Sequence, residues 1–407
     1  MATLVLISLG AACVLAWGVG LWVVCKHFLT TEIPAAISHP VRLRVLDCLC
    51  LLAVTWGTIL EKLGICSMPR FVQFIHDLPP VREDPDLVVT DLHFGTVLVR
   101  LYRPRAASST RRPGILFFHG GGNIMGSLKM YHGICSRLSK ESDSVVLAVR
   151  YRQGPDYRFP IPLRDCFVAT VHFLKSLDTF KVDPARVVIC GDSLGGGLAT
   201  VICQKLLNRP DLPKIRAQIL IYAASQALTF QHPSYQEYSK VPLLSRNFYF
   251  YCWCHYLGIS PSWESVVMKG AHLPAKVWAK YGKWFSLENI PEKFKKRSHQ
   301  LMAPTSLNED AYLETSVILD VSNSPLIAED DIISRLPETC IVTCENDLLR
   351  DHSLLYKKRL EDLKVPVTWC HMEDGFHGVL NTIDLGYLYF PCSRRIMNVI
   401  VNFVKGL

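Results

Sequence analysis

Apolar residues fill the start of the chain without interruption by charge. No charged side chain occurs from Met1 to Cys25, and the segment from Leu4 to Val24 is rich in Leu, Val, Ala, Ile and Trp. About 20 apolar residues cross a bilayer as a helix, because backbone groups in hydrocarbon must bond within the segment. A cleaved signal peptide has an apolar run of only about 7–15 residues and usually a basic start. We therefore predict an uncleaved, single-pass membrane anchor at residues 1–25.

A second apolar stretch follows the anchor. The segment Leu46–Leu60 contains Asp47, and at about 15 residues it suits an amphipathic or buried helix beside the membrane better than a second span. We assign residues 26–80 to such membrane-proximal or cap helices. Three basic residues lie on the C-terminal side of the anchor: Lys26, Arg42 and Arg44. By the positive-inside rule, they place the body of the protein in the cytosol.

From about residue 81 onward, short apolar runs alternate with helical patterns. Two β-branched segments predict an antiparallel pair of strands, namely Leu87–Leu92 and Thr96–Tyr102. Six apolar runs bounded by turn residues then predict buried strands: Ile115–Phe118, Val145–Val149, Val187–Cys190, Gln218–Tyr222, Cys340–Cys344 and Val365–Cys370. Helices are expected between strands, for example at Leu194–Leu207 and His352–Leu363. Continuously apolar strands are typical of a sheet covered on both faces, so the pattern predicts an α/β fold with a mostly parallel sheet flanked by helices.

The alternation lapses between about residues 229 and 322, where aromatic residues are concentrated. They are Phe248, Tyr249, Phe250, Tyr251, Trp253, Tyr256, Trp263, Trp278, Tyr281, Trp284 and Phe285. An insertion of this length is too long for a structureless loop. We predict a helical cap over the end of the sheet, which lines an apolar pocket and excludes water. Residues 81–407 then form one domain that carries this insertion.

Composition and charge exclude several classes of function. The chain has 407 residues, of which 49% are hydrophobic and 20% charged, and this balance favours a large folded core over disorder. The net charge of +8 is spread along the chain, without the basic and aromatic platform that indicates nucleic-acid binding. The 15 cysteines form neither paired CxxC units nor zinc-finger spacing, so no metal site is expected.

The strongest chemical signal is a serine that lies between a predicted buried strand and a predicted helix. It occurs in Gly191-Asp192-Ser193-Leu194-Gly195, which is the G-x-S-x-G pattern of a nucleophile elbow. Gly191 and Gly195 carry no Cβ where the backbone must crowd, so the hydroxyl of Ser193 is exposed above the sheet. It lies at the N-terminus of a helix, whose dipole favours a developing negative charge. We predict Ser193 as a nucleophile.

A glycine run follows another predicted strand. His119-Gly120-Gly121-Gly122 comes directly after Phe117-Phe118, and glycines allow backbone N–H groups to approach a tetrahedral oxyanion closely. One such donor is worth about 10²–10³ in rate. We assign the oxyanion hole to Gly120 and Gly121 with the amide of Leu194, and include His119 as the residue that anchors the loop. A phosphate-binding loop is the competing interpretation, but no G-K-[ST] follows.

A serine nucleophile needs a base within hydrogen-bond reach and an acid that orients the base. The chain order in this kind of fold is Ser, then Asp or Glu, then His. His377 lies in a glycine-flanked loop after the last predicted strand, and Asp347 follows the strand before it. We predict these two residues as base and acid. The rivals are His371 and His352 for the base, and Asp351, Glu345 and Asp374 for the acid.

With these residues in hand, the chain resembles the arylacetamide deacetylase family, a membrane-bound branch of the hormone-sensitive-lipase-like esterases. The resemblance covers nearly the whole chain, and its motifs are His119–Gly122, Gly191–Gly196, Ser324-Pro325-Leu326, Asp347–Asp351 and Asp374–Gly378. It implies an α/β-hydrolase fold with a helical cap and an N-terminal transmembrane helix, the acid at Asp347 and the base at His377. It also implies a type II anchor with the catalytic body in the lumen of the endoplasmic reticulum, and we follow it over the charge count.

Two segments depart from the family's pattern. The family's Y-R-L-A-P-E stretch is replaced by Tyr151-Arg152-Gln153-Gly154-Pro155-Asp156, and Asn123 follows the glycine run where a larger residue is common. The second change predicts an altered pocket shape and substrate preference.

The residues together predict a serine hydrolase that acts on lipophilic carboxylic esters or aryl amides through an acyl-serine intermediate. No cofactor or metal is implied, because the serine, base, acid and glycine loop supply the groups that the reaction needs. Membrane lipid and a lipophilic ester or amide are the expected partners, and nucleic acid is not. The alternative is a non-catalytic lipid-binding or scaffold protein that keeps the fold. The natural substrate and the oligomeric state stay open at this point.

Overall fold

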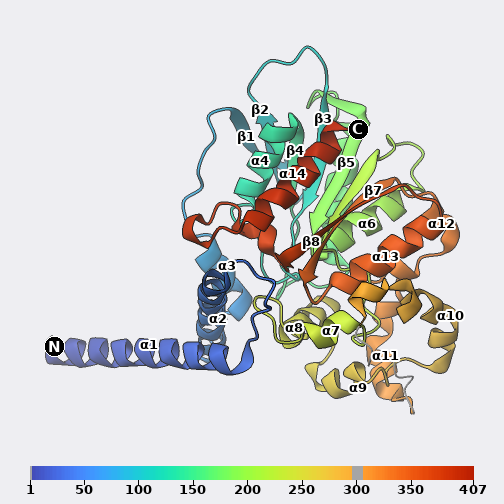
Figure 1. Ribbon diagram of the computed structural model, residues 1–407. Coiled ribbons are helices and arrows are strands. Elements are labelled where there is room, and N and C mark those ends of the chain that lie inside the picture. The colour runs from blue at the N-terminus through green and yellow to red at the C-terminus, as the bar shows by residue number, and fades with distance from the viewer. Residues whose placement is uncertain (1, 296–305) are drawn as a thin grey trace.

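An eight-stranded sheet forms the centre of the protein in the computed structural model, which describes residues 2–295 and 306–407 (Figure 1). The spatial order of its strands is β1-β2-β4-β3-β5-β6-β7-β8. The strands are β1 (Leu87–Phe94), β2 (Val97–Pro104), β3 (Arg112–Phe118), β4 (Val145–Arg150), β5 (Val182–Asp192), β6 (Ala217–Ile221), β7 (Glu338–Asn346) and β8 (Val367–Phe376). The pairings β1–β2 and β2–β4 are antiparallel, and the remaining pairs are parallel. Both the predicted antiparallel pair and the mostly parallel sheet are therefore confirmed.

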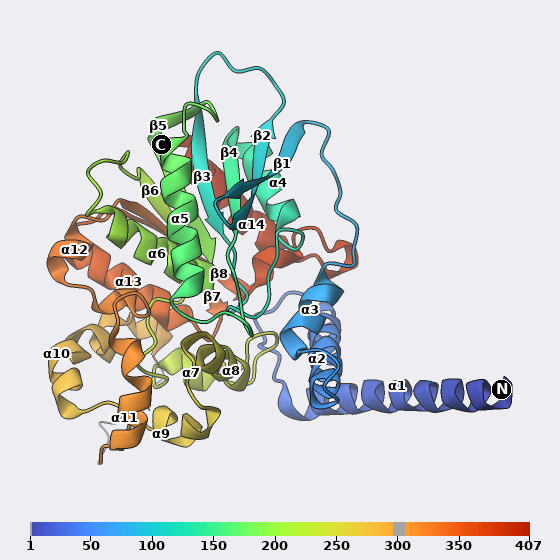
Figure 2. The ribbon, with the colours of Figure 1, turned by 180° about the vertical axis from the view of Figure 1, so that it is seen from behind.

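Helices cover the two faces of this sheet, because successive side chains of each central strand point to opposite sides. Leu116 and Phe118 of β3 pack into one buried cluster, and Ile115 and Phe117 pack into the other. The first cluster includes side chains of α5 (Ile161–Lys175), α6 (Leu194–Leu206) and α13 (Arg350–Asp362). The second includes α4 (His132–Ser142) and α14 (Pro391–Lys405). Figure 1 shows α4 and α14 in front of the sheet, and α5 lies in front in the reverse view of Figure 2.

A helical cap lies at the end of the sheet where the parallel strands finish. Its helices are α7 (Pro233–Glu237), α8 (Arg246–Leu257), α9 (Glu264–Met268), α10 (Ala275–Phe285) and α11 (Glu309–Thr315). The limits of α8 follow from its sequence: Ser245 accepts a hydrogen bond from the amide of Phe248, and Gly258 ends the helix with φ of 76°. The aromatic-rich stretch predicted to form a cap therefore does so, and residues 296–305 of the predicted insertion lie outside the described residues.

Two long apolar helices precede the sheet. The first, α1 (Ala2–Thr30), continues past the predicted limit at Cys25, and α2 (Pro40–Lys62) is longer than the predicted stretch of about 15 residues. Both are long and apolar enough to cross a membrane, although length and composition alone do not separate a span from a signal or a core helix. In both views α1 projects from the body while α2 lies crosswise to it, beside α3 (Met68–His76).

Candidate active site

Ser193 occupies a strained turn between β5 and α6. Its backbone has φ of 53° and ψ of −123°, a conformation that few non-glycine residues adopt. The neighbouring glycines make this turn feasible, because a Cβ at Gly191 would collide with the carbonyl of Gly195, and a Cβ at Gly195 with that of Phe118. The turn lifts the serine above the carboxyl end of the sheet at the start of α6. This is the local structure that the G-x-S-x-G pattern predicts.

The three residues predicted as nucleophile, base and acid lie in one hydrogen-bonded line. The Nε2 atom of His377 is 2.8 Å from Oγ of Ser193. On the other side of the ring, Nδ1 is 2.9 Å and 3.0 Å from the two carboxylate oxygens of Asp347. Asp347 is completely buried and His377 is 7% exposed. The roles of these residues remain predictions, but their geometry suits proton transfer between Ser193 and His377.

The acid is held by the loop that joins β7 to α13. The amide of Leu349 donates a 2.7 Å hydrogen bond to Oδ1 of Asp347. The ring of Tyr222, which follows β6, lies 4.9 Å from that of His377. The acid, the base and this packing partner all follow the carboxyl ends of neighbouring parallel strands, and this common position brings residues that are distant in sequence together.

The rival residues are engaged elsewhere in the described structure. His371 contacts Thr343 and Glu345, and Asp374 pairs with Arg395. Burial lowers the pKa of His352 well below its ordinary value, and its Nε2 atom lies 2.6 Å from the hydroxyl of Tyr235.

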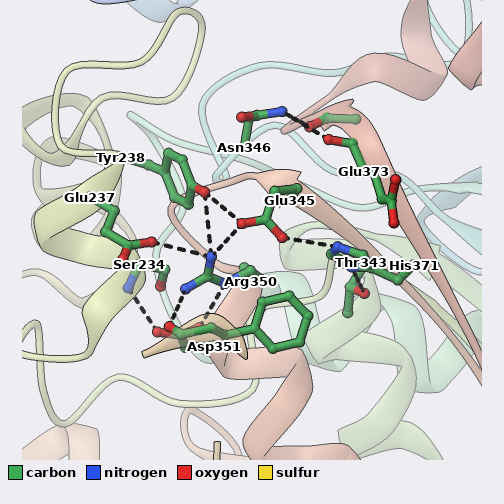
Figure 3. A network of polar contacts seen from close by, with 12 residues as sticks. Ser234, Glu237, Tyr238, Thr343, Glu345, Asn346, Arg350, Asp351, His371 and Glu373 are labelled. Carbon is green, nitrogen blue, oxygen red and sulfur yellow. Dashed lines mark hydrogen bonds and ion pairs between the residues drawn. The ribbon is translucent and has the colours of Figure 1, made fainter. Parts of the chain in front are cut away.

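Asp351 and Glu345 flank a second network, which Figure 3 shows around the buried side chain of Arg350. The guanidinium of Arg350 donates to Asp351 at 2.9 Å and to Glu345 at 2.9 Å. It also reaches Glu237 of α7 at 3.2 Å and the carbonyl of Phe294 at 3.1 Å, both in the cap. Arg350 therefore ties the cap to the strand and helix that enclose the acid loop. Arg350 lies within the Asp347–Asp351 motif, and its charge alone gave no sign of this buried network.

The glycine loop requires a correction. The amide of Gly120 donates to Oδ1 of Asp192 at 2.7 Å and lies 3.2 Å from the hydroxyl of Tyr131, so it cannot face an oxyanion. Within the part of the chain that the structure describes, the amides of Gly121, Gly122 and Leu194 have no hydrogen-bond partner. This pairing disfavours Gly120 as a donor, and we propose Gly122 beside Gly121 and Leu194 instead. A glycine run in the sequence indicates that the backbone must approach a bound group closely. It does not indicate which backbone amides lack a hydrogen-bond partner in the folded protein.

His119 anchors the glycine loop from beneath. Its ring stacks on Tyr151 at a centroid distance of 4.4 Å, and Nδ1 lies 2.8 Å from the carbonyl oxygen of Gly120. Burial lowers the pKa of His119 to about 4, so the ring is neutral and donates through Nδ1–H at neutral pH. This arrangement agrees with the anchoring role rather than with a direct contact to substrate.

Asp192 is a buried residue of the site for which the sequence offered little signal. Its carboxylate accepts hydrogen bonds from Gly120 and from the hydroxyl of Tyr131 at 2.9 Å. Burial raises its pKa to about 6, although the hydrogen bonds from Tyr131 and Gly120 act in the opposite direction. The sequence gives one hint: Asp192 comes directly before the serine of the elbow motif, and a residue there can contact the glycine loop.

A cavity of about 1770 Å³ opens onto Ser193 and His377. Pockets for drug-sized ligands usually measure about 300–1,000 Å³, so this one accommodates a larger substrate. The free amides of Gly121, Gly122 and Leu194 also line it. Aromatic and sulfur-containing side chains of α8 form one wall, and these are Phe248, Tyr249, Tyr251, Cys252 and Trp253. The cavity can therefore hold a long apolar group next to a polar reaction centre.

Comparisons with known proteins agree with this fold. A family profile described as the alpha/beta hydrolase fold matches residues 115–272 and 286–381. The chain is 65% identical to human arylacetamide deacetylase-like 3 over 99% of both chains, and 54% identical to human arylacetamide deacetylase-like 4 over 96% of both. We expected the chain to resemble the second of these relatives more, but its identity to the first is higher. A crystal structure of carboxyl esterase 2 from Tuber melanosporum matches with a TM-score of 0.60 at 22% identity, covering 80% of this chain and 89% of that one.

The fold, the arrangement of the site and these relatives define an α/β hydrolase of the carboxylesterase type. Esters or amides are the substrates that such relatives imply. More specifically, the chain belongs to the arylacetamide deacetylase family.

Proposed function

We propose that this protein hydrolyses lipophilic carboxylic esters or aryl amides through an acyl-Ser193 intermediate. The observation that carries the proposal is the continuous line of hydrogen bonds from Ser193 Oγ through His377 to Asp347, at 2.8 Å and 2.9 Å. Serine is a weak nucleophile without a base in contact with its hydroxyl. The buried carboxylate of Asp347 orients the imidazole and stabilises its protonated form.

The first half of the reaction acylates the serine. His377 Nε2 accepts the proton of the Ser193 hydroxyl while Oγ attacks the carbonyl carbon of the substrate. The tetrahedral oxyanion is stabilised by the amides of Gly121, Gly122 and Leu194. The imidazolium then gives its proton to the leaving oxygen or nitrogen, the bond between that atom and the carbonyl carbon breaks, and an alcohol or amine departs.

The second half releases the acid. A water molecule gives a proton to His377 and attacks the acyl carbon, and the proton returns to Ser193 as the carboxylic acid leaves. The apolar wall of the cavity supports a lipophilic acyl or aryl group on the substrate.

A fluorophosphonate probe tests the nucleophile. We expect the native protein to react and Ser193→Ala to stay unlabelled. Ser239→Ala is a matched control, because Ser239 lines the same cavity and its hydroxyl donates to the carbonyl of Gln236 rather than to His377. Its labelling should equal that of the native protein. Equal labelling of the native protein and Ser193→Ala removes Ser193 from the mechanism.

We also propose that residues 1–25 of α1 anchor the protein as a single-pass type II span, with the body in the lumen of the endoplasmic reticulum. The uncharged apolar run supports the span. The α2 helix is not a second span in this proposal, because Asp47 in its second turn is buried against the body and hydrogen-bonds Leu243 in the cap. Protease treatment of microsomes tests the sidedness: a lumenal body stays intact until detergent is added, and a body cleaved without detergent is cytosolic.

A further inference from the structure

The cavity that contains Ser193 continues to the helices next to the proposed anchor. Its wall includes Lys26, Leu29 and Thr30 at the end of α1. It also includes apolar side chains of α2 and α3, namely Leu46, Leu49, Cys50, Val54, Val72 and Ile75. One hollow therefore connects the reaction centre with the segment that leaves the body as α1.

The end of α1 carries residues that are typical of a membrane surface. Trp22 is 51% exposed, and Lys26 lies over its ring at 4.7 Å. Nearby on α1, the ring of Phe28 lies under Arg44 of α2 at 4.9 Å. Tryptophan and basic residues are enriched where a span meets the headgroups. The residues of α1 that line the cavity belong to this same part of the helix.

The orientation of α1 relative to the body is fixed by buried polar contacts. His27 of α1 is completely buried and its Nδ1 atom lies 2.7 Å from Asp47 of α2. The other oxygen of Asp47 accepts a 2.8 Å hydrogen bond from the amide of Leu243. Arg44 reaches the second ring nitrogen of His27 at 3.1 Å. Anchor, α2 and cap are thus joined at one point, so the direction of α1 determines which face of the body meets a bilayer.

The face on that side is apolar and exposed. Val41, Val45 and Leu49 are 63%, 40% and 51% exposed, and their spacing of four residues places them along one side of α2. Phe74 of α3 and Leu78 just beyond it are 60% and 58% exposed. Figures 1 and 2 agree that α1 leaves the body on the side formed by α2 and α3. Leu49 belongs both to this face and to the cavity wall, so it lies at the mouth of the cavity.

We propose that this apolar face of α2 and α3 rests in the surface of a lipid bilayer, and that lipophilic substrates enter the cavity from the bilayer past Leu49. The proposal rests on the esterase activity and the anchor proposed above, and it names the source of the substrate. A helix that lies across the end of a span is parallel to the membrane, which is the position of an interfacial amphipathic helix. Substrate then reaches Ser193 through one continuous cavity.

Full-length protein in phosphatidylcholine liposomes tests this route with two substrates. One is p-nitrophenyl palmitate dissolved in the bilayer, and the other is water-soluble p-nitrophenyl acetate. The variant is Val45→Glu, since Val45 lies on the face but does not line the cavity. Its matched control is Val168→Glu on α5, where the valine is 41% exposed, compared with 40% for Val45. Val45→Leu keeps the face apolar, and fluorophosphonate labelling of each variant verifies a folded site.

We expect Val45→Glu to lower kcat/KM for the palmitate by about tenfold, because a charge on the apolar face opposes insertion of that face into the bilayer. The kcat/KM for the acetate should change by less than about twofold. Val168→Glu and Val45→Leu should behave like the native protein with both esters. An unchanged rate with the palmitate in Val45→Glu overturns the proposal. The proposal is also overturned if the native protein is a dimer, Val45→Glu is a monomer, and Val45→Glu hydrolyses both esters more slowly. That result would mean that the face binds a second copy of the chain. If the proposed esterase function itself is wrong, the result is different. The native protein then hydrolyses neither ester, or Ser193→Ala hydrolyses both esters as fast as the native protein.

Discussion

Asp192 accepts a hydrogen bond of 2.7 Å from the amide of Gly120, which joins the residue before the candidate nucleophile to the glycine loop. The two loops follow neighbouring parallel strands, β3 and β5. The next two residues of the loop, Gly121 and Gly122, line the cavity. The position of the proposed oxyanion donors therefore depends on the buried carboxylate of Asp192, which lies outside the line of Ser193, His377 and Asp347.

The first prediction concerns Asp192 and rate. Asp192→Ala removes the acceptor that holds Gly120, so the amides of Gly121 and Gly122 lose their fixed position. We expect kcat toward a water-soluble ester to fall by about 10²-fold with KM little changed, because oxyanion contacts act mainly in the transition state. Steady-state kinetics check this. Asp183→Ala is a control, since Asp183 forms a partly exposed pair with Arg186 away from Ser193. Equal kcat values for the native protein and Asp192→Ala contradict the positioning role.

The second prediction concerns Asp192 and the pH dependence of stability. Burial raises the pKa of Asp192 to about 6 from an ordinary value of 3.8. Between these values the folded state holds a proton that the unfolded state has lost, so the free energy of unfolding decreases as pH rises from about 4 to about 6. The decrease amounts to about 3 kcal/mol at 1.36 kcal/mol per pH unit. Denaturant unfolding of native protein and Asp192→Asn across this range checks it. In Asp192→Asn, the free energy of unfolding should lack this decrease of about 3 kcal/mol between about pH 4 and about pH 6. If the free energies of unfolding of the two proteins change in parallel with pH, the prediction is contradicted.

The elements that carry the chemistry could be predicted because each has a local signal. A strand, a G-x-S-x-G turn and a helix are specified within a few residues, and Ser193 adopts the strained conformation that this pattern predicts. His377 and Asp347 could be ranked above their rivals because residues after the carboxyl ends of parallel strands meet at one edge. Their hydrogen bonds are in agreement with that ranking.

Other features depend on contacts between distant segments and could not be predicted from the sequence. The direction of the Gly120 amide is determined by Asp192, 72 residues later. The helix that contains the proposed anchor runs on to Thr30, past the last apolar residues, and its buried His27 meets Asp47 of α2. The two segments that depart from the family pattern also touch, since the amide of Gly154 donates to the carbonyl of Asn123 at 2.7 Å.

The third prediction distinguishes the acid from its rival. Asp347→Asn replaces an acceptor by an amide of similar shape, so Nδ1 of His377 loses its carboxylate partner and the imidazole its preferred tautomer. We expect kcat to fall by about 10³–10⁴-fold without unfolding. Asp374→Asn is the matched control, because Asp374 pairs with Arg395 near the surface and should leave kcat within about twofold. Kinetics with a soluble ester measure both variants. A larger loss in Asp374→Asn than in Asp347→Asn would transfer the role of acid to the rival.

The fourth prediction concerns the buried guanidinium of Arg350. Its side chain is 1% exposed and faces the carboxylates of Glu237, Glu345 and Asp351. Arg350→Met leaves these groups buried near one another without a cation, and the loss of one partner of a buried charge cluster costs about 3–5 kcal/mol. We therefore expect a clearly lower midpoint in thermal or denaturant unfolding.

Arg335→Met provides the comparison for Arg350→Met. Arg335 pairs with Asp331 at the surface, where their side chains are 46% and 80% exposed. An exposed pair of this kind contributes at most about 1 kcal/mol, so this variant should unfold close to the native midpoint. If Arg350→Met is as stable as Arg335→Met, the prediction is contradicted. Water must then reach the three carboxylates, and Arg350 does not hold the cap to the acid loop. Because Glu237 and the carbonyl of Phe294 belong to the cap, hydrogen exchange that rises first in α7 of Arg350→Met would locate the loss at that junction.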